Sequence, residues 1–430
     1  MQELNIPTID LPRVVILGGG FAGLKLARNI DSDLYQVVVI DRNNYHTFQP
    51  LLYQVATAGL EPDSIAYPLR KILKKKKRTH IRMAEINALN LNENSIDTSI
   101  GKLSYDYLVI ATGAKTNYFG NQNIEQFAMP MKTLSESLDL RSYILRRFEA
   151  ALNEKDQELR DSMMNFVVVG GGPTGVELAG ALSELKHHIL PKDFPDLDIR
   201  RMQIHVIEAG PKLLAGMSDN AAKNAFSYLK EIDVNVWLDT MVSDFDGQTV
   251  STNQVTMQTN NLIWAAGVQG NIPEGIPEEV IEKSRLKINE DLKLIGYDNV
   301  FAMGDVALLM SKEYPKGYPM LGSVAQQQGS FLATYLKKVA NGQSLNVFKY
   351  KDKGTMATIG RNKAVVDLGK FEFGGFIAWL AWLFVHLMLL VDFRNRLIVF
   401  FNWVWSYVNY DRGTRLITRQ IKPRIRKEAA

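Results

Sequence analysis

A glycine-rich turn that occurs twice is the feature that most constrains how this chain can fold. The first copy, GGGFAG, follows the apolar run Arg13–Leu17, and the second, GGGPTG, follows Phe166–Val169. In such a turn the first glycine permits a tight bend, the second lets the backbone approach a pyrophosphate, and the third lets the helix pack on the strand. The glycines in these positions are Gly18, Gly20 and Gly23, then Gly170, Gly172 and Gly175. We therefore predict two dinucleotide-binding units, each with phosphates at a helix N-terminus.

An acidic residue follows each turn at the end of the next predicted strand. Asp41 lies 23 residues after Gly18, and Glu208 lies 38 residues after Gly170. The polar stretch 187–201 has the character of an insertion and accounts for the longer second gap. Each carboxylate is placed to accept hydrogen bonds from ribose hydroxyls. Glu208 would repel a 2′-phosphate, so NADH is favoured over NADPH. A purely structural glycine turn is the alternative, but strand, helix and acid together favour binding.

Short apolar runs alternate with helical patterns along most of the chain, which predicts an α/β fold with parallel sheets. Helical patterns cover about 133–160, 175–190 and 217–231. Two of the strands end in small or acidic residues suited to a flavin nucleotide, namely Thr112 with Gly113, and Asp305. Two dinucleotides in one chain indicate a permanently held flavin and an exchanging nicotinamide. The remaining predicted strands are Val37–Ile40, Tyr107–Ile110, Ile204–Ile207, Leu262–Trp264 and Asn299–Ala302.

The absence of cysteine limits the chemistry. None of the 430 residues is a cysteine. This excludes disulfide scaffolds, zinc–thiolate and iron–sulfur sites, cysteine nucleophiles and an active dithiol. We predict no metal site, and any redox chemistry must pass through a bound cofactor.

Charge and aromatic residues are concentrated at the C-terminus. The formal charge is +4, but residues 411–430 carry seven basic and two acidic residues, or +5, which leaves −1 for the rest. Two apolar runs precede them, 376–391 and 397–408, separated by the charged stretch 392–396. Neither reaches the ~20 residues that span hydrocarbon. We predict two amphipathic helices lying in a membrane interface, with a hydrophobic dimer interface as the alternative. Four of the six tryptophans lie here: Trp379, Trp382, Trp403 and Trp405.

Several segments together resemble one protein family. GGGFAG, ATGA, GGGPTGVELAG, WAAG and FAMGDVA are similar to the two-dinucleotide flavoprotein disulfide-reductase superfamily. Within it, NYHTFQPLLYQVA at residues 44–56 and the C-terminal tail resemble type II NADH dehydrogenases. The similarity covers essentially the whole chain. Disulfide reductases and sulfide:quinone reductases share the architecture but need cysteines.

The resemblance implies where the nucleotides bind. For FAD, bound non-covalently, it implies Gly18, Gly20, Phe21, Ala22, Gly23, Asp41, Arg42, Gln49, Thr112, Gly113, Gly304, Asp305 and Ala325. For NADH as substrate, it implies Gly170, Gly172, Gly175, Glu208 and Gly267. A turn amide is the alternative for Gln49.

The resemblance also implies catalytic and quinone-binding residues. Glu177 would lie beside the contact of nicotinamide and flavin; the alternative is an acid in the first helical turn that complements the helix dipole. Gln327 would donate a hydrogen bond to a quinone carbonyl. Ser323 stands where the family has a glutamine, and a helix cap is its alternative. His386 would approach the quinone, unless it is simply satisfied locally.

We thus predict two Rossmann-like (glutathione-reductase-type) domains and a C-terminal membrane-anchoring helical region. The expected domains are an FAD-binding part at 1–125, an inserted NADH-binding domain at 126–290, a second FAD-binding part with the quinone segment at 291–370, and anchoring or dimerisation helices at 371–430. The function implied is non-proton-pumping NADH:quinone oxidoreduction with menaquinone or ubiquinone. A related flavoprotein with a non-quinone acceptor is the alternative. We expect a homodimer, peripheral on the cytoplasmic face of the cell membrane, and no nucleic-acid partner.

Overall fold

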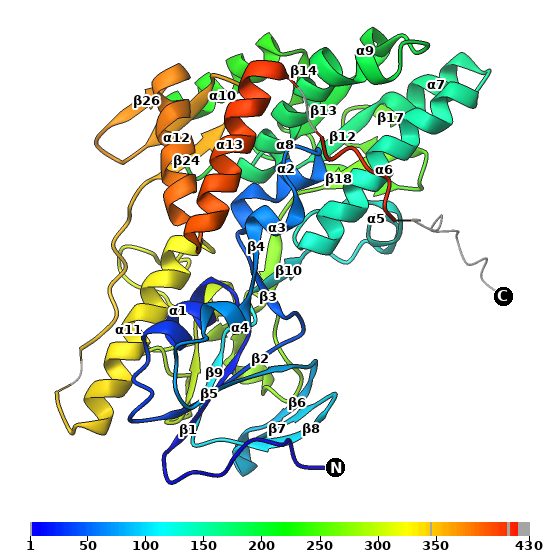
Figure 1. The fold of residues 1–430 in the computed structure, drawn as a ribbon. Coiled ribbons are helices and arrows are strands. Elements are labelled where there is room, and N and C mark those ends of the chain that lie inside the picture. The colour runs from blue at the N-terminus through cyan, green and yellow to red at the C-terminus, as the bar shows by residue number, and fades with distance from the viewer. Residues whose placement is uncertain (1, 345, 411–412, 420–430) are drawn as a thin grey trace. The chain divides into compact units, whose positions relative to one another are not determined.

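The structure is a computed structural model that describes residues 2–344, 346–410 and 413–419 (Figure 1). The chain divides into two compact units, each made of three segments. Residues 1–47, 67–115 and 268–353 form the first unit, and residues 48–66, 116–267 and 354–430 form the second. Each unit contains one of the two glycine turns, and each is described by itself below.

A five-stranded parallel sheet forms the core of the first unit. Its strand order is β22-β9-β1-β2-β5. The edge strand β22 comes from a segment near residue 300 and pairs with β9, which lies nearly 200 residues earlier in the chain. β1 is buried apart from its first residue, as expected of a strand covered on both faces. Helices α1 and α11 pack on each other beside this sheet. The bounds are β1 Arg13–Leu17, β2 Gln36–Asp41, β5 Thr79–Met83, β9 Tyr107–Ile110, β22 Val300–Ala302, α1 Phe21–Asn29 and α11 Gly322–Ala340.

Shorter elements complete the first unit. β6, β7 and β8 form an antiparallel sheet, and β20, β21 and β23 form a small mixed one. Their bounds are β6 Ile86–Asn90, β7 Ser95–Thr98, β8 Gly101–Ser104, β20 Ile281–Glu282, β21 Arg285–Lys287 and β23 Ala307–Leu308. Further elements are β3 Tyr45–Thr47, α4 Leu69–Ile72 and β19 Val268–Gly270, together with β4 Ala66–Pro68 and β10 Ala114–Thr116, each of which has one terminal residue in the second unit.

A second five-stranded parallel sheet, in the order β11-β18-β12-β13-β14, forms the core of the second unit. The helix predicted over 133–160 is in fact two helices, because Asp156 accepts the N–H groups of Glu158 and Leu159 and so caps a new helix. The bounds are β11 Met129–Pro130, β12 Phe166–Val169, β13 Ile204–Ile207, β14 Val234–Trp237, β18 Asn261–Trp264, α6 Leu134–Asn153, α7 Gln157–Met164, α8 Pro173–Glu184, α9 Leu190–Asp193 and α10 Asp219–Glu231.

Smaller elements of the second unit include two three-stranded antiparallel sheets, β15-β16-β17 and β24-β25-β26. The strand bounds are β15 Val242–Phe245, β16 Thr249–Thr252, β17 Thr256–Gln258, β24 Thr355–Thr358, β25 Ala364–Asp367 and β26 Glu372–Gly374. Three short helices are α2 Leu52–Ala56, α3 Pro62–Ile65 and α5 Gln122–Phe127.

Two helices of the second unit correspond to the apolar runs of the tail: α12, Gly375–Leu389, and α13, Phe393–Asn409 (orange and red in Figure 1). The charged stretch 392–396 that interrupts the apolar sequence lies mostly inside the second helix, because α13 begins at Phe393 with Asp392 before it. Polar contacts hold α13: Asn395 donates to two carbonyls of α3, and Trp403 Nε1 donates to Gln54 Oε1 at 2.8 Å.

Among the described residues, no helix is at once long enough and apolar enough to cross a lipid bilayer. Part of the basic C-terminal segment predicted to contact lipid lies outside the described residues, namely Arg412, Lys422, Arg424, Arg426 and Lys427.

Candidate active site

The glycine turn after β1 has the geometry of a phosphate cradle. Gly18 has φ +104°, and a Cβ there would lie 2.4 Å from the carbonyl oxygen of Ala111. A Cβ on Gly23 would lie 1.9 Å from the carbonyl oxygen of Gly18, so α1 packs on the turn only because this residue is glycine. A Cβ on Gly20 would meet nothing within 4 Å. The backbone is therefore open at the position where a pyrophosphate is expected, and the turn fits a dinucleotide.

Two buried or half-buried side chains hold this turn. Asp41 Oδ2 accepts the N–H of Gly19 at 2.6 Å, and Oδ1 accepts the N–H of Asn43 at 2.7 Å. Burial raises the pKa of Asp41, and these two donors oppose the rise. His46 Nδ1 donates to the carbonyl oxygen of Gly19 at 3.0 Å. Burial lowers the pKa of His46 to about 4, so the ring is neutral. Sequence reasoning quoted the segment containing His46 but gave this residue no role.

The other FAD candidates of the first unit gather around β9 and β22. Gly113 has φ +71° and open space beside it, while Thr112 Oγ1 donates to the carbonyl oxygen of Asn271 at 2.6 Å. Gly304 has φ +76°, and its N–H is bound at 2.7 Å by Oε1 of Gln328, a fully buried side chain that sequence reasoning missed. Asp305 follows in the same short turn.

Three further candidates of the first unit surround the start of α1. A Cβ on Gly304 would lie 3.3 Å from Cβ of Ala22 and 3.6 Å from Cβ of Ala325, so these three small residues allow the turn at Gly304 to lie close to α1 and α11. The ring of Phe21 meets His46 edge to face at 5.2 Å. Arg42 is exposed, and its charge opposes the raised pKa of Asp41. Gln49 is also exposed, in a turn of the second unit.

The second glycine turn repeats the geometry of the first. Gly170 has φ +113°, and a Cβ there would lie 2.6 Å from the carbonyl oxygen of Ala265. A Cβ on Gly175 would lie 1.9 Å from the carbonyl oxygen of Gly170, and Gly172 again has open space. Glu208 takes the place of Asp41: Oε2 accepts the N–H of Gly171 at 2.6 Å, and Oε1 accepts that of Gly210 at 2.8 Å.

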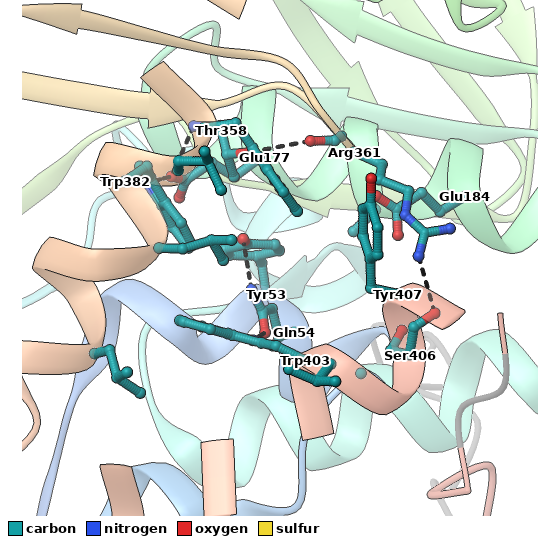
Figure 2. A pocket seen from close by; sticks show the side chains of 18 of the residues that line it. Tyr53, Gln54, Glu177, Glu184, Thr358, Arg361, Trp382, Trp403, Ser406 and Tyr407 are labelled. Carbon is teal, nitrogen blue, oxygen red and sulfur yellow. Dashed lines mark hydrogen bonds between the residues drawn. The ribbon is translucent and has the colours of Figure 1, made fainter. Parts of the chain in front are cut away.

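Glu177 is buried in the second unit. It lies beyond the first turn of α8, which begins at Pro173, so its predicted first-turn position was wrong. Its Oε1 accepts the indole N–H of Trp382 at 3.2 Å and the backbone N–H of Thr358 at 3.4 Å (Figure 2). Burial raises the pKa of Glu177 to about 8, and the two hydrogen bonds oppose the rise. Glu177 is therefore mostly protonated at neutral pH.

Glu177 borders a mainly apolar cavity of 480 Å³ within the second unit (Figure 2). Aromatic and aliphatic side chains from both C-terminal helices form much of its wall, including Phe376, Trp379, Trp382, Leu387, Trp403 and Tyr407. Polar side chains are in the minority and include Tyr53 and Gln54 on α2, Glu184 on α8, Arg361 after β24, and Ser406 on α13 itself. An apolar cavity with few polar groups is typical of a site for a small hydrophobic molecule.

Comparisons with known proteins bear on this arrangement. A family model described as pyridine nucleotide-disulphide oxidoreductase matches residues 12–329, and one described as NDH2 C-terminal domain matches residues 353–409. Type II NADH:quinone oxidoreductase Ndh of Mycobacterium tuberculosis is 34% identical over 98% of this chain and 94% of that protein. NdhA of the same organism is 36% identical over 95% of this chain and 90% of that protein. This chain is a type II NADH dehydrogenase family member.

A solved structure supports the fold of this type II NADH dehydrogenase. NDH2 from Plasmodium falciparum in complex with NADH matches 95% of this chain and all of that chain, with a TM-score of 0.85 at 22% identity. The family resemblance and the fold class predicted from the sequence are confirmed.

The quinone-site candidates of this family member lie in different units. Ser323 and Gln327 lie at the start of α11 in the first unit. Ser323 Oγ lies 3.1 Å from the hydroxyl of Tyr350, and the Gln327 amide pairs in both directions with the backbone of Lys351, at 2.9 and 3.0 Å. His386 lies on α12 in the second unit.

His386 is buried beside Trp382. The two rings stack with centroids 3.9 Å apart, and His386 Nδ1 donates to the carbonyl oxygen of Trp382 at 2.8 Å. Burial lowers the pKa of His386 to about 4, so this ring is neutral and Nε2 carries no proton. Sequence reasoning selected His386 but grouped Trp382 with the tryptophans of the membrane interface, whereas Trp382 is buried and joins His386 to Glu177.

Proposed function

We propose that this protein is an FAD-dependent NADH:quinone oxidoreductase that does not pump protons. NADH, a proton and a quinone are converted into NAD⁺ and a quinol, and FAD supplies the group that accepts the hydride and returns two electrons. The observation that carries the proposal is a buried Glu177, its pKa raised by burial, at the wall of an apolar cavity in a chain with two built dinucleotide cradles.

The two cradles have different occupants in this proposal. The turn at Gly18–Gly23, with Asp41, would hold the pyrophosphate and ribose of FAD, and Thr112, Gly113 and Asp305 would line the rest of that site. The turn at Gly170–Gly175 would hold NADH. Glu208 favours NADH over NADPH there, because a 2′-phosphate would meet its carboxylate.

Glu177 is proposed as a proton donor for the bound quinone, menaquinone or ubiquinone. Because its Oε1 accepts two N–H groups, the proton of the neutral acid is carried on Oε2. A carboxyl with a pKa near the working pH both holds and releases a proton readily. Aromatic side chains of the cavity would receive the quinone ring and its isoprenoid chain.

The quinone roles of Ser323, Gln327 and His386 remain proposals. Neutral His386 could accept a hydrogen bond at Nε2 from a hydroxyl of the quinol. Gln327 would have to exchange one of its hydrogen bonds to Lys351 for one to a quinone carbonyl. Ser323 would have to turn from Tyr350 in the same way.

The C-terminal helices are proposed to bind the cytoplasmic face of the cell membrane peripherally, and to contribute to a homodimer. An exposed apolar surface of this kind marks an interaction site. α12 exposes Phe376, Ile377, Leu380, Phe384, Met388 and Leu389, and α13 exposes Phe393, Leu397, Phe400, Phe401, Val404, Trp405 and Val408.

Anaerobic stopped-flow absorbance tests the function. NADH should bleach the oxidised flavin of the purified holoprotein, and a short-chain quinone mixed in next should restore it much faster than air-saturated buffer does in a parallel run. NADPH at the same concentration serves as the control and should bleach the flavin more slowly. If NADH reduces the flavin but no quinone restores it faster than oxygen, the acceptor is not a quinone and the related flavoprotein with another acceptor is the correct function.

A further inference from the structure

Strand order in the second unit determines where the two halves of NADH can lie. The pyrophosphate turn follows β12, and Glu208, which would bind the adenosine ribose, follows the neighbouring strand β13. A dinucleotide is linear with its pyrophosphate in the middle, so its other half must extend in the opposite direction. β18 is the strand on that side of β12. The nicotinamide riboside half would therefore extend over the carboxyl end of β18, at Ala265–Gly267.

An exposed aromatic ring lies at this place. A Cβ built on Gly267 would lie 3.0 Å from Cζ of Phe119, so the ring packs closely over this glycine and a side chain there would crowd it. The ring of Phe119 also meets that of Trp264 edge to face, with centroids 6.4 Å apart. Phe119 is nevertheless 68% exposed, so this ring is not part of the core.

The backbone of Phe119 is strained. Its φ is +52°, in the left-handed region that bulky residues rarely adopt. Two hydrogen bonds maintain the conformation: Asn117 Oδ1 accepts the N–H of Phe119 at 2.8 Å, and the carbonyl oxygen of Asn117 accepts the indole N–H of Trp264 at 2.8 Å. The strain is not compensated by burial of the side chain. Backbone strain that persists at such an exposed position is evidence of a function for the side chain.

We propose that Phe119 contacts the substrate, its ring forming the apolar wall against which the nicotinamide riboside half of NADH is held. The inference rests on the placement of NADH in the proposed function and adds a determinant of nicotinamide binding. An aromatic ring suits this half because nicotinamide is itself a flat ring that stacks or packs edge to face.

Binding of two ligands to the oxidised holoprotein tests the inference by isothermal titration calorimetry. NAD⁺ carries the nicotinamide, and ADP-ribose lacks it. Phe119→Gly removes the ring, and because glycine adopts positive φ readily, the loop should keep its conformation. We expect the Kd for NAD⁺ to rise roughly 3- to 10-fold, the loss expected for one aromatic contact, while the Kd for ADP-ribose changes less than about twofold.

Two control variants make the outcome decisive. Phe119→Tyr keeps the ring and should retain NAD⁺ affinity. Phe371→Ala removes another exposed phenylalanine of the second unit, 71% exposed, and should change neither Kd. An unchanged Kd for NAD⁺ in Phe119→Gly, or an equal loss for both ligands, would overturn the inference.

A third variant separates this inference from the proposed function. Glu208→Arg should alter the affinity for ADP-ribose, because Glu208 faces the adenosine ribose in the proposed placement. An unaltered ADP-ribose affinity would contradict the proposed placement of NADH, and the Phe119 contact that depends on it would fail as well. None of these measurements involves a quinone, so failure of quinone turnover would leave them interpretable.

Discussion

Replacing Glu177 with glutamine should remove one loss of folding stability that accompanies rising pH. Glutamine has nearly the same shape, and its carbonyl oxygen can still accept from Trp382 and Thr358. The difference is that glutamine never ionises. Burial raises the pKa of Glu177 in the folded protein, so between the unfolded and folded pKa values the folded state binds more protons than the unfolded state. Stability contributed by this group is therefore complete below the unfolded pKa and is lost as pH rises.

The size of the effect follows from the two pKa values. Between the ordinary value of 4.5 and the folded value of about 8, the loss amounts to about 5 kcal/mol, since each tenfold change in proton affinity is worth about 1.36 kcal/mol. From pH 5 to pH 7.5 the wild type should lose about 3 kcal/mol relative to Glu177→Gln. The comparison of the two proteins cancels every other titrating group, including the buried histidines.

Urea unfolding of both holoproteins, followed by circular dichroism at pH 5, 6.25 and 7.5, measures this difference. The two free energies of unfolding should lie within about 1 kcal/mol of each other at pH 5 and diverge in favour of Glu177→Gln as pH rises. Parallel pH profiles would refute the reasoning, because they would mean that Glu177 titrates alike in the folded and unfolded states.

Three further predictions concern activity and location. Trp382→Phe keeps a ring but removes the N–H that opposes the raised pKa of Glu177, so the alkaline decline of quinone turnover should move to higher pH while flavin reduction by NADH is unchanged. Glu208→Arg should raise the kcat/KM ratio of NADPH over NADH about tenfold or more, and an unchanged ratio would exclude Glu208 from the ribose site. Phe401→Glu combined with Trp405→Glu places two charges on the exposed face of α13; flotation with anionic liposomes should be lost, and continued flotation would contradict membrane binding through this face.

Local signals made the two sheets and both glycine turns predictable. A short, β-branched apolar run followed by glycines determines strand, turn and helix within about a dozen residues, and the observed strands β1 and β12 have the predicted bounds. The division of the helix over 133–160 also had a local signal, because Asp156 followed by acidic Glu158 is a helix start. That signal was present but was outweighed by the apolar periodicity on both sides.

Contacts between distant segments had no such signal. Trp382 reaches Glu177 across 205 residues, and Thr358 reaches it across 181. Gln328 accepts the N–H of Gly304 because α11 packs beside that turn, and no sequence motif near either residue predicts this hydrogen bond. The sequence therefore predicted which residue types carry the chemistry, but not the hydrogen bonds that tune them. The domain bounds and the individual site roles stay predictions.

The C-terminal helix α12 shows how one element serves both the surface and the site. Its exposed residues are apolar, whereas the residues it buries, spaced four apart, are Ala378, Trp382 and His386. A soluble helix has the opposite arrangement, so hydropathy alone indicates only an apolar run. Each buried polar hydrogen on α12 has an acceptor: Trp382 Nε1 donates to Glu177, and His386 Nδ1 donates to the backbone of its own helix. Burying an indole N–H is costly without such an acceptor, so Trp382 and Glu177 depend on each other. Ionisation of Glu177 would strengthen the hydrogen bond from Trp382, but burial disfavours the charged form, so the contact from α12 and the protonation of Glu177 influence each other.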